Sequence, residues 1–234
     1  MLLLLCAPAW AAMTVTNCNT GTPASATTMT VTCSSVTAGD LLAVYAFSNN
    51  NVTVSSVSDT TNGTTGWVSG LSVATLNVPG RGSWWVTPNS GASAGTLTVT
   101  VTFSGATGGG EIALKRIANA ATSSPLDGAG CSHDVGSSTN PSCALTTTNA
   151  NTTLLTGVAT SSGATTTVGG SYTDTQKPDT YVTVANKYVT ASGSQTVNPI
   201  SWTGSTGALQ VAIAVKEAAG GAVATPRRRP LVFQ

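Results

Sequence analysis

The chain has 234 residues, enough for one large β-sandwich or at most two small domains. Charged residues make up 7% of it and the net charge is +1, whereas an ordinary soluble domain has about 25% charged residues. Arg227, Arg228 and Arg229 supply three of the nine basic residues, so the rest of the chain carries six basic and eight acidic side chains, a balance of −2. This balance excludes a basic nucleic-acid-binding surface on the body of the protein. Thr, Val, Gly, Ser and Asn replace charged residues, as is typical of extracellular β-proteins.

The first twelve residues, MLLLLCAPAWAA, have the apolar core and the small-x-small end of an export leader, but no positively charged start. We expect residues 1–12 to be either a cleaved leader or an apolar N-terminal arm. No other apolar run approaches the ~20 residues of a membrane-spanning helix, so no membrane span is expected.

Four cysteines remain after such a leader: Cys18, Cys33, Cys131 and Cys143. An even number in an exported chain predicts two disulfides, and three pairings are possible. Proximity in the sequence favours Cys18–Cys33 and Cys131–Cys143. A zinc site is disfavoured, because there is no CxxC pair and His133 is too close to Cys131 for a normal finger.

Alternating apolar and polar residues predict ten strands along the chain. In order, they span residues 29–33, 40–47, 51–57, 83–87, 96–103, 111–117, 153–160, 180–190, 195–202 and 209–217. Segment 111–117 contains good helix formers, but seven residues between a glycine triplet and Asn119 are too few for a stable helix. Leu97, Val99 and Val101 should face the core, with Thr98 and Thr100 on the opposite face.

Gly-, Pro-, Ser- and Asn-rich turns separate these strands at the 8–12-residue spacing of sandwiches and barrels. We therefore predict an all-β fold: a single antiparallel two-layer sandwich of jelly-roll type with about twelve strands, over residues 13–218. Segments 111–117 and 209–217 both look like core strands that need partners from the other half, which favours one domain over two. A flexible Gly/Ala linker and a basic, apolar tail follow at 219–234.

Several stretches carry a resemblance to a known family. They are GDLLAVYAF, SSVSDTTNGTTGW, AGTLTVTVTFSG, the turn Ser124–Asp127, LTTTNANTTLL, TVANKYVTASGSQT and AIAVKEA, within residues 24–218. Their order resembles a widespread, mostly uncharacterised family of bacterial and phage-associated surface proteins with a predicted jelly-roll fold. The resemblance implies an extracellular or virion-associated module and supplies no catalytic residues. The cysteines at 131 and 143 and the arginine-rich end depart from the family pattern.

Catalytic patterns are weak in this chain. His133 is the only histidine, and its neighbours Ser132 and Asp134 are too close in sequence for triad geometry. Most of the eight acids sit at turns, so no carboxylate pair for sugar hydrolysis stands out. No cofactor is required, although calcium could bind between loop oxygens. The two candidate calcium sites are Asp59 with Asn62, and Asp174 with Asp179.

These patterns favour a non-enzymatic structural or adhesive building block on a cell surface, filament or virion. Its partners would be other proteins of an assembly or copies of itself. The alternative is a carbohydrate-binding module that binds surface glycans through Trp84 or Trp85. Adjacent strand residues point to opposite faces, so one of the two tryptophans should lie outside the core or at its rim and could stack on a sugar.

The C-terminal segment is a candidate attachment arm. Arg227, Arg228 and Arg229 could bind carboxylates or phosphates through their forked donors. The apolar run Leu231, Val232 and Phe233 could add a strand to the exposed sheet edge of a neighbour.

Overall fold

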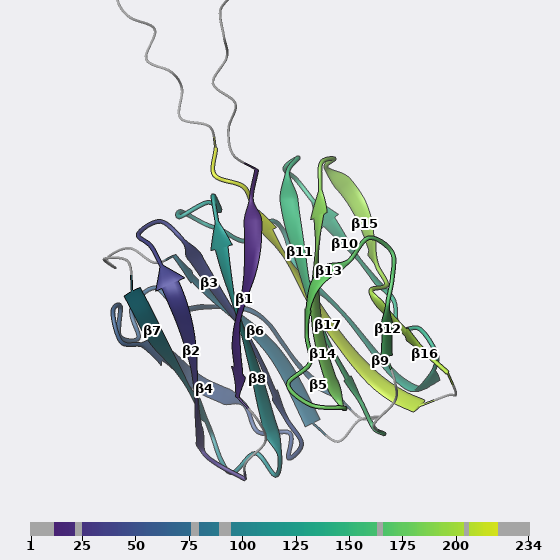
Figure 1. Ribbon diagram of the computed structural model, residues 1–234. Helices are drawn as coiled ribbons and strands as arrows, with labels where there is room; N and C mark the ends of the chain where they lie inside the picture. The colour runs from purple at the N-terminus through teal and green to yellow at the C-terminus, as the bar shows by residue number, and fades with distance from the viewer. Residues whose placement is uncertain are drawn as a thin grey trace, which may run out of the picture.

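The computed structural model describes residues 12–21, 25–75, 80–88, 95–162, 166–203 and 206–219. Within these ranges the chain is all β, with seventeen strands in five sheets whose neighbouring strands pair antiparallel (Figure 1). No described segment forms a helix that is long and apolar enough to cross a membrane.

Strands β1 to β8 build two sheets from the first half of the chain. The outer sheet has the order β2 (Thr28–Val36), β7 (Gly95–Phe103), β4 (Val54–Asp59). The inner sheet has the order β1 (Thr14–Gly21), β8 (Gly110–Ala118), β3 (Leu41–Ser48), β6 (Gly80–Pro88), β5 (Val68–Thr75).

Strands β9 to β17 build three sheets from the second half. Its inner sheet has the order β13 (Thr173–Gln176), β14 (Val182–Val189), β11 (Thr152–Thr160), β17 (Thr206–Lys216), β9 (Cys131–Ser138). Two small outer sheets pair β10 (Cys143–Thr147) with β15 (Gly193–Val197), and β12 (Thr166–Val168) with β16 (Ile200–Trp202).

The two halves repeat one arrangement. The inner order β1-β8-β3-β6-β5 corresponds strand for strand to β9-β17-β11-β14-β13. The outer order β2-β7-β4 corresponds to β10, then β15 with β16, then β12. Asn198 and Pro199 separate β15 from β16, and a proline interrupts a central strand because it has no amide hydrogen to donate. The interruption divides the second outer layer into two small sheets.

The sheets stack in four layers, with the two inner sheets facing each other (Figure 1). Along β3, Leu41, Ala43 and Tyr45 pack in a cluster with β11 and β17, whereas Leu42 and Val44 pack toward β2 and β7. Every residue of β3 and of β11 is buried, while the outer strand β7 alternates between buried and half-buried positions. A strand covered on both faces has no position for an exposed side chain, so its sequence is a nearly continuous apolar run.

The strand predictions are confirmed in type but incomplete in number. Nine predicted segments each contain one strand, including 111–117 in β8, and segment 195–202 splits into β15 and β16. Strands β1, β5, β9, β10, β12 and β13 were not predicted, so the described residues contain seventeen strands rather than about twelve, in four layers rather than two. The missed strand β1 shows the reason: its TVTNCNTG sequence has almost no apolar residues, because none of its positions is fully buried.

The predicted core register is confirmed. Leu97, Val99 and Val101 are all at most 2% exposed, and so are Val211 and Ile213 of β17. The intervening threonines of β7, Thr98 and Thr100, are half-buried on its other face.

A tyrosine–glycine contact shows how closely the inner sheets approach. Tyr45 of β3 lies over Gly157 of β11, where a Cβ atom would stand 2.4 Å from the nearest ring carbon. Gly157 therefore leaves the space that the Tyr45 ring fills, and any side chain at this position would push the two halves apart.

We predict that Gly157→Ala lowers the free energy of unfolding by about 1–3 kcal/mol, the usual cost of overpacking. Gly169→Ala is the matched control, because a Cβ atom there meets no heavy atom within 4 Å. Urea unfolding of both variants tests this. Equal stability of the two variants would show that the inner sheets do not pack at this distance.

Candidate functional site

In each half, one disulfide joins the inner sheet to the outer layer. Cys18 of β1 is bonded to Cys33 of β2, and Cys131 of β9 is bonded to Cys143 of β10, with Cα atoms 4.7 Å and 5.9 Å apart. Both predicted pairings are thus present. Because β1 and β2 correspond to β9 and β10, the two bonds occupy equivalent places in the repeated arrangement.

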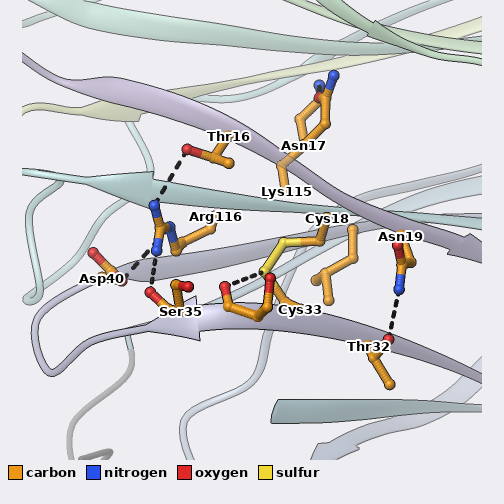
Figure 2. The surroundings of a disulfide bond; sticks show 12 residues. Thr16, Asn17, Cys18, Asn19, Thr32, Cys33, Ser35, Asp40, Lys115 and Arg116 are labelled. Carbon is orange, nitrogen blue, oxygen red and sulfur yellow. Dashed lines mark hydrogen bonds and ion pairs between the residues drawn. A yellow bond between two sulfur atoms is a disulfide. The ribbon is translucent and has the colours of Figure 1, made fainter. Parts of the chain in front are cut away.

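Polar contacts from Arg116 reinforce the first disulfide (Figure 2). The guanidinium of Arg116, on β8, forms an ion pair with Asp40, with Nε 3.8 Å from Oδ2. It also donates to the carbonyl of Ser35 and to the hydroxyl of Thr16. The side chain therefore ties the inner sheet to the end of β2 and to the turn that follows it.

The interface between the two inner sheets contains a fully buried lysine. Lys115 of β8 is 0% exposed. Its Nζ donates to Oδ1 of Asn17 at 2.6 Å and to Oδ1 of Asn186, in the other half, at 3.1 Å. Gln176 crosses the same interface and donates to the main-chain carbonyl of Cys18 at 2.8 Å. Buried polar groups require such partners, so these bonds hold the halves in one register.

A carboxyl pair lies in the same interface. Glu111 of β8 is 2% exposed and hydrogen-bonds to Asp179, which precedes β14. Burial first, and then the hydrogen bond and charge of Asp179, raise the pKa of Glu111 to about 9. Burial first, and then Glu111, also raise the pKa of the neighbouring Tyr45 above its usual range. Glu111 is therefore protonated at neutral pH.

This carboxyl pair does not suit glycosidase chemistry. Such enzymes hold a sugar between two carboxyl groups about 5–5.5 Å or 6.5–9.5 Å apart. Glu111 and Asp179 hydrogen-bond directly, and Glu111 is closed off between two sheets. The pair was not predicted, because Asp179 stands 68 positions further along the chain and carries no local signal. The only hint was a strand, EIALKRI, that places Glu111 and Lys115 on the same face as Ala113 and Ile117.

The first candidate calcium site is a turn held by hydrogen bonds. The buried carboxylate of Asp59 accepts from the main chain of Thr61, from the main chain and amide of Asn62, and from the indole of Trp67 at 2.9 Å. Asn62 thus points its amide donor, rather than its carbonyl, at Asp59. These donors occupy the oxygens that a cation would need, so Asp59 serves as a turn organiser.

The second candidate calcium site falls partly outside the described residues, since these exclude the side chain of Asp174. Its expected partner, Asp179, contacts Glu111 instead and accepts from the main chain of Tyr181 and Val182. The described residues contain no group of three or more His, Cys, Asp or Glu side chains that could hold a metal ion.

Asp127 organises the loop between β10 and β11. Its carboxylate accepts from Thr148, Asn149 and Thr152. Burial alone would raise the pKa of Asp127, but the hydrogen bonds from Thr148 and Asn149 outweigh it and lower the pKa to about 2. This carboxylate therefore anchors the segment that connects the two halves.

His133 is held by a main-chain contact. Its Nδ1 accepts from the amide of Ser142 at 3.0 Å. Ser132, His133 and Asp134 are consecutive residues of β9, so the histidine points to the opposite face from both neighbours. This geometry gives no Ser-His-Asp triad.

The two candidate sugar-stacking tryptophans point to opposite faces of β6, and Trp84 is the fully buried one of the two. Trp84 is 0% exposed between the inner sheets, where its indole donates to the carbonyl of Val211 at 3.0 Å. Its ring lies 5.3 Å from that of Tyr45, centre to centre. Trp85 is half-buried against the cluster of the outer sheet. Trp84 is therefore closed to a sugar, and Trp85 is the one of the two that stays a candidate.

The attachment-arm residues Arg227, Arg228, Arg229, Leu231, Val232 and Phe233 lie outside the described residues.

Comparison with protein-family models, with curated proteins and with solved structures finds no match for this chain. What the arrangement offers chemically is a set of buried polar groups that contact one another across the sheets, together with two interlayer disulfides.

We predict that replacing either cysteine pair with serine lowers the free energy of unfolding by about 3 kcal/mol, because each bond closes a loop of comparable length. The sequence separations are 15 and 12 residues. Urea unfolding of the double variants, with non-reducing peptide mapping of the native protein, tests this. Free thiols at all four positions of the native protein would contradict it.

A second prediction concerns pH. The pKa of Glu111 is about 9 in the folded protein, whereas the ordinary value for a glutamate, which applies to the unfolded chain, is 4.5. Between these values the folded state binds more protons than the unfolded state, so stability falls as pH rises, by up to about 1.4 kcal/mol per pH unit. Glu111→Gln, which keeps a neutral side chain that can donate to Asp179, should remove this loss and be more stable than the parent at pH 8.

Unfolding by urea at pH 5 and pH 8 measures the effect. Glu217→Gln, at the half-buried residue that follows β17, serves as the control and should keep the pH dependence of the parent protein. An unchanged pH dependence in Glu111→Gln would show that Glu111 ionises freely in the folded protein.

Proposed function

We propose that this protein is a non-enzymatic structural or adhesive building block, displayed on a cell surface, a filament or a virion. The observation that carries the proposal is the layered body, in which a disulfide fixes each outer layer to its inner sheet. Such a body is rigid, and disulfides persist in extracellular and virion-surface environments.

We also propose that each half is a jelly roll. The order β1-β8-β3-β6 facing β2-β7-β4 supports this, since jelly rolls are built from about eight strands in two sheets with Greek-key connections. Jelly rolls form viral capsid and lectin domains. Membership of the family of bacterial and phage-associated surface proteins belongs to the same proposal, and it rests on the stretches quoted from the sequence.

The state of the polar residues supports a scaffold rather than a catalyst. Glu111 and Lys115 hold the interface between the halves, and Asp59 and Asp127 hold turns. A catalytic group must instead reach its substrate from an accessible site.

The test is to localise the protein in the cells that produce it. Immunogold labelling and fractionation should place it on an outer surface or in an assembled particle, with both disulfides formed. A reduced protein confined to the cell interior would overturn the proposal. Saturable sugar binding on a glycan array, reduced by Trp85→Ala, would favour the carbohydrate-binding module instead.

A further inference from the structure

An open apolar pocket of about 490 Å³ lies where the two halves of the chain are joined. The start of β5, the end of β6 and the connecting segment 119–130 form its walls. Its lining residues are Val68, Pro88, Thr122, Ser124, Pro125 and Leu126, together with Gly66. None of them is charged, and Val68 keeps 44% of its surface exposed. The volume lies in the range of ligand-binding pockets, and the lining selects an apolar occupant.

The C-terminal end of the described chain runs along the wall of this pocket. The amide of Lys216 donates to the carbonyl of Pro125, a lining residue, at 2.8 Å. The amide of Ala218 donates to the carbonyl of Asn119 at 2.8 Å. The described residues end at Ala219, three positions after Lys216, so the described chain ends beside the pocket.

Residues 220–234 contain an apolar run of suitable size. Leu231, Val232 and Phe233 stand 12 to 14 positions beyond Ala219. The intervening residues GGAVATPRRRP include two glycines and two prolines. A flexible chain of this length spans roughly 20 Å, and prolines and like charges extend it further, so its length is enough to return to the pocket. Because the run is tethered, its effective concentration at the pocket is in the millimolar range, so even a weak apolar contact is occupied.

We propose that Leu231, Val232 and Phe233 dock into this pocket of their own chain. Docking removes the exposed surface of Val68 and the phenyl ring of Phe233 from water. The arginines 227–229 precede the apolar run and stay in solvent, since the pocket offers them no carboxylate. This docking does not depend on whether the protein is displayed on a surface.

The N-terminal apolar residues are the rival occupant, because they precede a segment that lies at the same end of the body. Asn119 donates to the carbonyl of Ala12 at 3.2 Å, and the amide of Met13 donates to Glu217 at 3.1 Å. Removal of residues 1–11 separates the two candidates. Crosslinks from position 233 should be unchanged by it, and a yield that rises would show that the N-terminal run occupies the pocket.

The test is site-specific photo-crosslinking in the full chain, with p-benzoylphenylalanine in place of Phe233. We expect crosslinks within one chain to residues 66–68, 88 and 122–126, with a yield that does not change on dilution. Val68→Asp places a charge in the pocket and should lower the yield roughly tenfold, which corresponds to the loss of one good apolar contact. Val68 is exposed, so this variant should still fold.

Ser69→Asp is the matched control, because it adds the same charge to the next residue of β5, which is exposed and does not line the pocket. It should leave the crosslinks unchanged. Crosslinked dimers whose yield rises with concentration would show that the run binds another copy, and would overturn the proposal. Crosslinks elsewhere on the protein, or a yield unaffected by Val68→Asp, would overturn it as well.

Discussion

The central strands of the two inner sheets have no face in water, because each inner sheet packs against the other and against an outer layer. This packing restricts the amino-acid composition of the inner strands. Strands such as β3, β11 and β17 have almost no position for a charged side chain. It also explains the state of polar groups in this interface: Glu111 is protonated at neutral pH, and Lys115 and Gln176 are hydrogen-bonded.

The outer layers depend on different forces. Each is smaller than the inner sheet that it covers, and each is bonded to that sheet by a disulfide at the same place in the strand order. Covalent links compensate for the limited apolar area that a three-stranded or two-stranded sheet can bury. The resulting body is a stiff stack of sheets, and its polar side chains such as Glu111 and Lys115 are buried inside it. The two ends of the sheet stack lie close together, since the amide of Met13 donates to Glu217. A building block requires these same properties.

Sequence patterns predicted what local periodicity controls. They gave the buried strands, the register of β7, the strand character of segment 111–117 and the two disulfides. They missed β1, β9 and β10, whose Ser, Thr and Asn residues lie at half-exposed edges or outer layers and so show no alternation. The number of layers was also missed, because the partner of a sheet face lies far away in sequence. For the same reason, the burial of Trp84 and the pairing of Glu111 with Asp179 could not be predicted, and the repeat of strand order between halves was visible only in the fold.

The central claim is that the shared interface makes the two halves one cooperative unit. Native-state hydrogen exchange tests it most directly, because it reports the free energy of opening for each strand separately. The account predicts that amides of β3 and β8, in the first half, and of β11 and β17, in the second, exchange only through global unfolding, with one common free energy. If the strands of one half open at a clearly lower free energy than those of the other, the halves are independent and the account is wrong.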